Sequence, residues 1–139
     1  MSSHPDLSEV DGQLVRPVLF DDCRVVRAHG ELDLLTVAPL VRALNLARTG
    51  RGRLCLIVDL SEVTFADGSI LGPLSDAWAD CRERHGWVRV VYTTSATALL
   101  FRAGGLADRF PGYASARDAW RGVAEGPGTA SRPMWGKGA

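Results

Sequence analysis

Apolar residues form a nearly unbroken run at positions 54–60, in the middle of a chain whose other apolar runs are shorter. A continuous apolar run of strand length that is rich in β-branched residues is typical of a strand covered on both faces. Positions 88–92 form a second such run that only Arg89 interrupts. We expect the two runs to pair in parallel at the centre of an α/β sheet.

Two β-prone runs precede the central strand, at residues 14–20 and 23–28, and Asp21-Asp22 separates them. This spacing suits a hairpin, which would give the sheet an antiparallel edge. Residues 110–113 could add a last short strand. The pattern therefore predicts a mixed sheet of four to five strands.

Apolar positions at helical spacing predict about four α-helices around this sheet. The first is expected to be capped by Thr36, to hold Pro39 in its first turn and to end at residues 50–52. Its shared apolar face would consist of Val37, Leu40, Val41, Leu44 and Ala47.

Two further helices are expected after the central strands. One would be capped by Thr94 or Ser95 and would stop at the glycine pair that follows Arg102. The other would cover residues 115–123 and turn Ala119 and Trp120 toward the core. Both expectations depend on capping residues and on apolar spacing.

The helix after the central strand carries the sharpest candidate for function, Ser69. Pro73 is tolerated only in the first turn of a helix, so this helix should start near Ser69. With Ser69 as N-cap, an apolar face follows at helical spacing, and Gly86 ends the helix. This places a serine at the exposed, positive end of a helix, just beyond the carboxyl end of a central strand, where α/β folds often bind ligands.

Length and composition favour a single domain. The chain has 139 residues, of which 46% are hydrophobic, enough for one good core. We expect a domain over residues 14–123, with a flexible N-terminus at 1–13 and a disordered, Gly- and Pro-rich tail at 124–139. Within this plan the functional residues should lie in one compact unit.

The charge distribution, the apolar runs and the cysteines of the chain exclude several classes of protein. The formal net charge is zero, with no basic cluster that would favour nucleic acid or a membrane surface. The sequence contains no signal peptide and no apolar run long enough for a membrane span. Cys23, Cys55 and Cys81 sit in apolar patterns without metal-ligand spacing. These features predict a cytoplasmic protein with reduced cysteines and no metal or cofactor.

Two sequence motifs resemble the signature of the STAS domain, the fold shared by anti-sigma factor antagonists and the cytoplasmic tails of sulfate transporters. The first runs Val58-Asp-Leu-Ser-Glu-Val-Thr-Phe-Ala-Asp-Gly-Ser69, and the second is Gly30-Glu31-Leu32-Asp33. Residues 94–110 resemble the late helix and final turn of the family. The resemblance covers roughly residues 14–123, and without a membrane span it implies a free-standing domain.

The resemblance implies a non-enzymatic switch. In STAS antagonists a serine or threonine at the position of Ser69 is phosphorylated by a partner that is both an ATPase-type serine kinase and an anti-sigma factor. The unmodified protein binds this kinase and frees a sigma factor, and a serine phosphatase resets the modified form. The residues expected at the partner surface are Asp67, Gly68, Ile70, Leu71, Glu31 and Asp33. Weak homodimer formation is left open.

The sequence departs from the family pattern beside the acceptor. Gly68 replaces a hydroxyl residue, and Ile70 replaces the glycine that usually follows the acceptor. A β-branched neighbour stiffens the turn and could crowd a kinase active site. The alternative is therefore a STAS scaffold that is not phosphorylated and binds a protein or small ligand constitutively.

A hydrolase interpretation belongs to another class. It would use Ser69 as nucleophile, His29 or His85 as base, and Asp67 or Asp33 to orient the base. Residues 68–72 lack the Gly-x-Ser-x-Gly spacing of a nucleophile elbow. A helix that begins at Ser69 and ends near His85 would also separate these two residues by more than ~20 Å. Cap and turn roles for Asp67 and Asp33 are the plain structural alternative.

Overall fold

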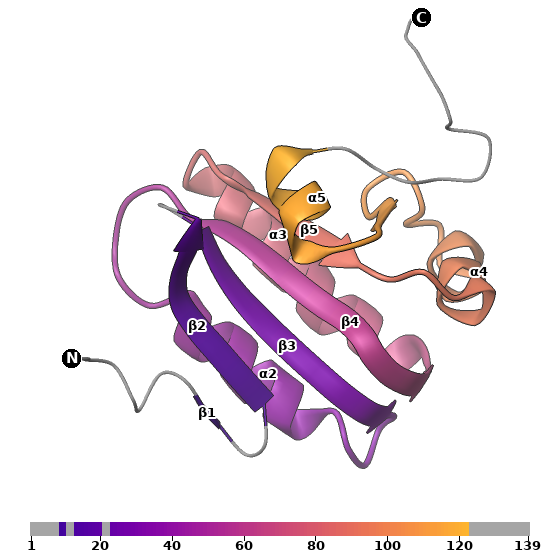
Figure 1. Ribbon diagram of the computed structural model, residues 1–139. Coiled ribbons are helices and arrows are strands. Elements are labelled where there is room, and N and C mark those ends of the chain that lie inside the picture. Colours follow the sequence, from indigo (N-terminus) through magenta and orange to yellow (C-terminus); the bar gives the residue numbers. More distant parts are fainter. Residues whose placement is uncertain (1–8, 11–12, 21–22, 123–139) are drawn as a thin grey trace, which may run out of the picture.

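The computed structural model describes residues 9–10, 13–20 and 23–122. Six strands form one mixed sheet in the order β1-β2-β3-β4-β5-β6 (Figure 1). Strands β1 to β3 pair antiparallel, and β3 to β6 pair in parallel. Their bounds are Glu9–Val10, Gln13–Phe20, Cys23–Leu32, Cys55–Ala66, Trp87–Val91 and Gly112–Tyr113.

This topology confirms the α/β class, the hairpin and the parallel pairing of the two most apolar runs. The sheet has one strand more than expected, because the two residues of β1 pair with β2 ahead of the predicted start of the domain. Other residues of the expected flexible N-terminus, and all of the expected tail at 124–139, lie outside the described residues.

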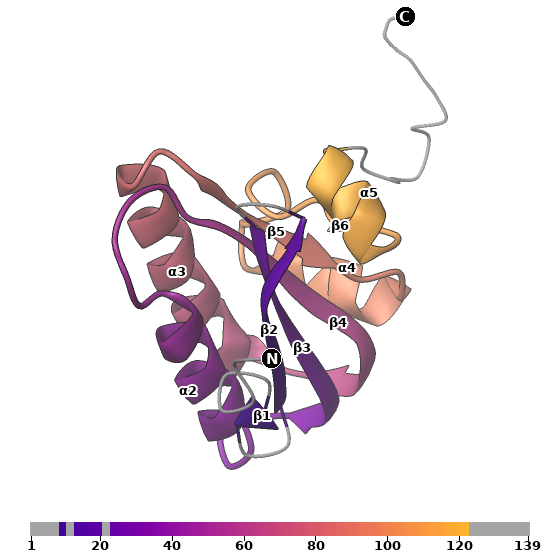
Figure 2. The ribbon, with the colours of Figure 1, turned by 60° about the vertical axis from the view of Figure 1, so that its left-hand side comes forward.

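Within the described residues four α-helices pack around the sheet: α2 (Ala38–Ala47), α3 (Leu71–Glu83), α4 (Ser95–Ala103) and α5 (Ala116–Arg121). Figures 1 and 2 show α2 and α3 side by side on one face of the sheet, with α5 on the opposite face. The larger core lies under α2 and α3 and also takes in Phe101 of α4. A smaller core lies under α5, where Val25, Ile57 and Ala119 pack together.

Most of the helical faces follow the predicted spacing. On α2, Val41 is only half-buried, and Ala43 is buried with Leu40, Leu44 and Ala47 instead. Thr36 does not cap α2, because the N-cap position belongs to Val37 and makes no side-chain hydrogen bond. The capping role of Thr94 is confirmed.

Trp120, expected to face the core, is 38% exposed, whereas its neighbour Ala119 is fully buried. Helix α5 has only six residues and is capped by Ser115, and the large ring of Trp120 stays outside.

Gly86 joins α3 to β5 at a point where no side chain fits. A Cβ added there would lie 1.7 Å from the carbonyl oxygen of Leu54, which belongs to the backbone. The Gly86 N–H donates to Cys81 O at 2.7 Å and so closes the end of the helix. The stop expected at this glycine is therefore imposed by close backbone packing.

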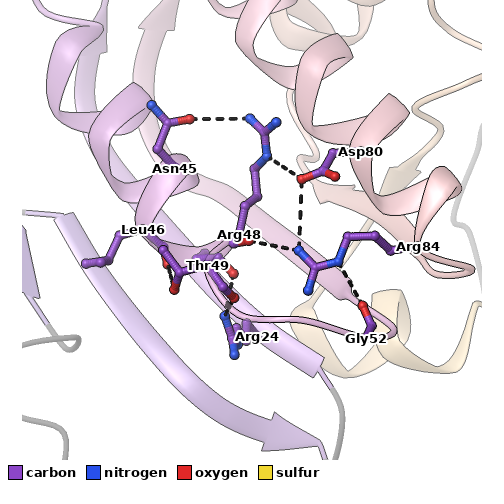
Figure 3. A network of polar contacts seen from close by, with 9 residues as sticks. Arg24, Asn45, Leu46, Arg48, Thr49, Gly52, Asp80 and Arg84 are labelled. Atoms are coloured by element: carbon purple, nitrogen blue, oxygen red, sulfur yellow. Dashed lines mark hydrogen bonds and ion pairs between the residues drawn. The ribbon is translucent and has the colours of Figure 1, made fainter.

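Arginine side chains tie together the amino end of the parallel strands (Figure 3). Arg24 Nη1 donates to Ala47 O at 2.6 Å and to Thr49 O at 3.0 Å. Arg84 donates to Gly52 O and Arg48 O, both at 2.8 Å. The guanidinium groups thus hold the carbonyls at the end of α2 and in the connection that follows it.

The carboxyl end of the parallel strands

Strands β3 and β4 end side by side at the point where both family-like motifs end. Leu32 is the register partner of Ala66, and Glu31 is the partner of Phe65. The Asp67 N–H then donates to Leu32 O at 3.0 Å, so the pairing continues one residue beyond β4. The segment around Glu31 and the segment around Ser69 are therefore brought together, as the family resemblance implied.

Ser69 lies in a single 3-10 turn, Gly68–Ile70, between β4 and α3. The N-cap of this turn is Asp67, whose carboxylate Oδ1 accepts the Ser69 N–H at 2.8 Å. The prediction of Ser69 as N-cap is wrong, because the aspartate two residues earlier takes this position. Asp67 serves instead as the cap that the plain structural alternative gave it.

The Asp67 carboxyl has a pKa below its ordinary value of 3.8. The Ser69 side chain is the largest cause and the Ser69 N–H the next, and both stabilise the charged form. The carboxylate is thus held ionised beside the serine. Any negative charge added to Ser69 would meet this fixed charge at close range.

The Ser69 hydroxyl points away from solvent. Its Oγ exposes less than 1 Å² and makes no well-aligned hydrogen bond among the described residues, although it lies close enough to the Asp67 carboxylate to lower the pKa of that group. We expected an exposed hydroxyl, and this expectation is wrong for the conformation observed. The turn as a whole is still at the surface, because Gly68 and Gly72 on either side are exposed.

The other residues expected at the partner surface differ in exposure. Glu31 and Gly68 are exposed, and Asp33, Asp67 and Leu71 are half-buried. Ile70 is fully buried in the larger core. Its side chain therefore offers no contact to a partner, and the expectation that it does is corrected to an anchoring role.

The loop between β3 and α2 holds two leucines out in water. Asp33 Oδ1 accepts the N–H groups of Leu35 and Thr36 at 2.9 and 3.0 Å. Thr36 Oγ1 accepts the Asp33 N–H at 2.9 Å and donates to Glu31 O at 2.8 Å. Leu34 and Leu35 are 79% and 89% exposed. The loop thus has a fixed shape and presents apolar side chains with nothing packed on them.

Two more exposed apolar side chains lie at the same end of the sheet. Phe65 of β4 and Leu99 of α4 are 52% and 54% exposed, and both line a groove of about 480 Å³. We call Leu34, Leu35, Phe65 and Leu99 the carboxyl-end patch. Of the large exposed apolar side chains in the described part of the chain, only Trp120 lies elsewhere.

Sequence reasoning missed the leucines of this patch. The signal was present, because Leu34 and Leu35 fall between a loop-closing aspartate and a helix that Pro39 prevents from starting earlier. Adjacent apolar residues in a loop cannot share one buried face. Phe65 and Leu99 gave no such signal, since strand and helix positions are usually apolar on one side.

Comparison with known proteins identifies the fold family. A family model described as "Mlab, STAS domain" matches residues 17–112. The chain belongs to the STAS domain family. A search of curated proteins gave no match.

Solved structures of anti-sigma factor antagonists are similar to this STAS domain. One from Mycobacterium paratuberculosis is 28% identical with a TM-score of 0.66, covering 80% of this chain and 92% of that one. Unphosphorylated SpoIIAA is 18% identical with a TM-score of 0.63, covering 81% and 99%. Phosphorylated SpoIIAA of Bacillus is 18% identical with a TM-score of 0.59, covering 80% and 98%. The SpoIIAA matches speak for the fold alone.

The residues of the hydrolase interpretation are not assembled in this STAS domain. His85 follows the far end of α3, about 20 Å of helix from Ser69. Neither histidine reaches Ser69 Oγ, which has no hydrogen-bond partner within the described ranges. Asp33 and Asp67 are engaged by backbone N–H groups. Domains of this family are generally binding scaffolds without enzymatic activity.

The described residues form neither a metal site nor a helix that could span a membrane. No group of three His, Cys, Asp or Glu side chains comes together there as a metal site would require. No helix in the same part of the chain has the length and apolar character needed to cross a bilayer. The three cysteines are buried free thiols, as expected, and burial raises the pKa of Cys81 to about 12.

Proposed function

We propose that this STAS domain is a cytoplasmic anti-sigma factor antagonist that binds an anti-sigma factor serine kinase and thereby frees a sigma factor. The carboxyl-end patch is the observation that carries this proposal. Four large apolar side chains are exposed at the end of the sheet where both family motifs end, and two of them, Phe65 and Leu99, share a groove. Exposed apolar side chains clustered on a fixed frame are typical of protein–protein interfaces.

Acidic side chains near the carboxyl-end patch make this surface of the domain negatively charged. Glu31 and Glu62 are exposed, and Asp67 is held ionised beside Ser69. A partner that fits would present apolar pockets for the leucines, ringed by lysine or arginine. Charge complementarity of this kind speeds encounter and fixes the orientation of the complex.

Phosphorylation of Ser69 would end the association by electrostatics. A phosphate adds a charge of about −1.5 to −2, and it would stand next to the Asp67 carboxylate inside the interface. Desolvating both charges weakens the complex, and each 1.4 kcal/mol costs tenfold in affinity. The helix end itself tolerates the anion, so the fold would persist. A serine phosphatase would restore binding.

Binding to purified anti-sigma factor serine kinases of the source organism tests the proposal. We expect wild type and Ser69→Ala to bind with similar affinity, and Ser69→Asp to bind at least about tenfold more weakly. Absence of binding to every kinase, or equal binding of the alanine and aspartate variants, would contradict it. A serine-directed fluorophosphonate probe that labels Ser69 would instead revive the hydrolase interpretation.

The alternative function is a STAS scaffold that binds constitutively, and the shielded Ser69 hydroxyl favours it. Mass spectrometry after incubation with kinase and ATP separates the two. The switch predicts one added phosphate on Ser69, and the scaffold predicts none. Sedimentation of the free protein over a range of concentrations would settle weak homodimer formation.

A further inference from the structure

Ser69 combines two properties that rarely occur together. Its Oγ exposes less than 1 Å² and makes no well-aligned hydrogen bond within the described residues, yet it lies in a turn flanked by exposed glycines. The Ser69 side chain lies close enough to the Asp67 carboxylate to lower the pKa of that group. A shielded hydroxyl without a well-aligned hydrogen bond gains one when it turns to water, which favours a minor open conformation.

The turn around the hydroxyl is held from both sides. On one side the Asp67 carboxylate accepts the Ser69 N–H at 2.8 Å, and the Asp67 N–H is bonded to Leu32 O. On the other side Ile70 is 0% exposed and sits in the larger core. Ile70 thus fixes the backbone that directs Ser69 inward. Gly68 adds no restraint, because an added Cβ there would meet nothing within 4 Å.

Phosphotransfer cannot start from this conformation. The hydroxyl oxygen must bond to the γ-phosphorus of ATP while the bond to the leaving oxygen of ADP breaks, and its proton must pass to a base of the kinase. An oxygen with less than 1 Å² of exposed surface cannot reach the phosphorus. The side chain must first swing out.

We propose that the turn Gly68–Ile70 is a gate on Ser69, and that Ile70 sets how often it opens. In the closed state the hydroxyl is shielded, and in a minor open state it faces solvent. The phosphorylated side chain fits only the open state, because its charge cannot occupy the shielded position of Oγ beside the ionised Asp67 carboxylate. The role of the gate rests on the proposed function, since it limits the rate at which a bound kinase modifies its antagonist.

The gate can be tested without any kinase, by placing a thiol at the acceptor position. Ser69→Cys is treated with dithiobis-nitrobenzoate, with wild type as blank because its three cysteines are buried. The matched control is Gly68→Cys, one residue away in the same turn but exposed. We expect the thiol at 69 to react about 100-fold more slowly than the thiol at 68, as for an open state populated near 1%.

A second substitution shows whether Ile70 controls the opening. Adding Ile70→Ala to Ser69→Cys should raise the rate about tenfold, because the open state becomes more populated. Leu74→Ala is the control, since Leu74 is equally buried but lies one turn into α3. Equal rates at positions 68 and 69, or equal acceleration by both alanine variants, would overturn the gate.

Amide hydrogen exchange adds a measurement on the natural serine. The Ser69 N–H should be protected in wild type and lose protection in Ile70→Ala before the rest of α3 does. Loss of protection over the whole helix at once would mean global unfolding and would overturn the gate. If the thiol and exchange results hold but no kinase modifies either protein, the gate stands and the proposed function falls.

Discussion

At the amino end of the parallel strands, arginines satisfy the carbonyls where α2 stops, whereas at the carboxyl end leucines stand in water and a serine hydroxyl has no partner. Arg84 bridges residues 32 and 36 positions away in the sequence. The bonds of Asp33 and Thr36 stay within five residues. The arginine bonds at the amino end connect distant segments, whereas the loop that presents the leucines at the carboxyl end is shaped by local bonds.

This difference indicates that the amino end of the parallel strands mainly stabilises the fold, whereas the carboxyl end is available for binding a partner. Helix ends leave carbonyls unsatisfied, and the planar guanidinium, with its fixed donors, can hold two of them at once. The Arg48–Asp80 ion pair at 3.0 Å adds to this network (Figure 3). At the carboxyl end the long-range bonds, such as Asp67 N–H to Leu32 O and Tyr92 Oη to Phe110 O, hold backbone segments and leave Leu34 and Leu35 exposed. These leucines can therefore meet a partner at little cost to the fold.

The largest expected effect is on stability, from Gly86→Ala at the tied end. The new Cβ would collide with the Leu54 backbone, which has no flexible part that could move away. We expect a loss of about 3 kcal/mol or more in the free energy of unfolding, at the upper end of overpacking effects. Urea denaturation followed by circular dichroism measures it.

The control is Gly72→Ala at the other end of α3. An added Cβ there meets nothing within 4 Å, and alanine favours the helix by up to about 1 kcal/mol. If both variants were equally stable, the close contact at Gly86 would not limit the fold.

A smaller loss of stability is expected from Arg84→Met. It removes two hydrogen bonds from a charged donor to backbone carbonyls and keeps the apolar stem. We expect about 2 kcal/mol of destabilisation, with kinase binding unchanged. Arg102→Met, at an exposed position in α4, is the control and should change stability by less than about 0.5 kcal/mol. Impaired binding without loss of stability would break the comparison.

The reverse result is expected from Leu34→Ser combined with Leu35→Ser at the free end. Loss of two anchors from an interface should weaken binding to the cognate kinase by about 10- to 100-fold, and the folded state should keep its stability. Trp120→Ser removes an exposed ring outside the carboxyl-end patch and should leave binding unchanged. Calorimetric titration measures affinity. If the leucine substitutions hardly changed the affinity and Trp120→Ser lowered it strongly, the binding surface would lie at α5 and not at the carboxyl-end patch.

The smallest expected effect is the pH dependence that Asp67 adds to the free energy of unfolding. Its pKa is lowered in the folded state, so its stabilising contribution is complete above the ordinary carboxyl pKa of 3.8 and is lost as pH falls through the lower folded value. In Asp67→Asn this acid-dependent part should disappear. Urea midpoints between pH 2 and pH 6 should converge for wild type and variant at the acid end. If the urea midpoints of the two proteins differed by a constant amount at every pH, the charge of Asp67 would contribute nothing to stability.

Sequence reasoning succeeded where a local pattern is sufficient. The run at 54–60 predicted the central strand, and Pro73 placed the start of α3 within two residues of its position, Leu71. Spacing also predicted a face of α3 formed by Leu71, Leu74, Ala77 or Trp78, and Cys81, of which Leu74, Ala77 and Cys81 are buried. Such features depend on backbone sterics and on periodic burial, which a short stretch of chain already contains.

Sequence reasoning failed where two neighbouring residues compete for one role. Asp67 and Ser69 can both cap a helix, and in the folded domain the Asp67 carboxylate takes the Ser69 N–H while Ile70, the next residue, packs into the core. Likewise, the loop after β3 has a fixed path that leaves Leu34 and Leu35 uncovered. The local sequence does not determine which distant segments will cover a given side chain in the folded domain.

By itself, the sequence determined the order of strands and helices, the parallel centre of the sheet and the position of a serine at a strand-to-helix junction. These follow from hydrophobic periodicity and from the conformational limits of proline and glycine. The tertiary structure alone decided the exposure of the patch and the direction of one hydroxyl group, because solvent access depends on segments that are distant in the chain and meet only after folding.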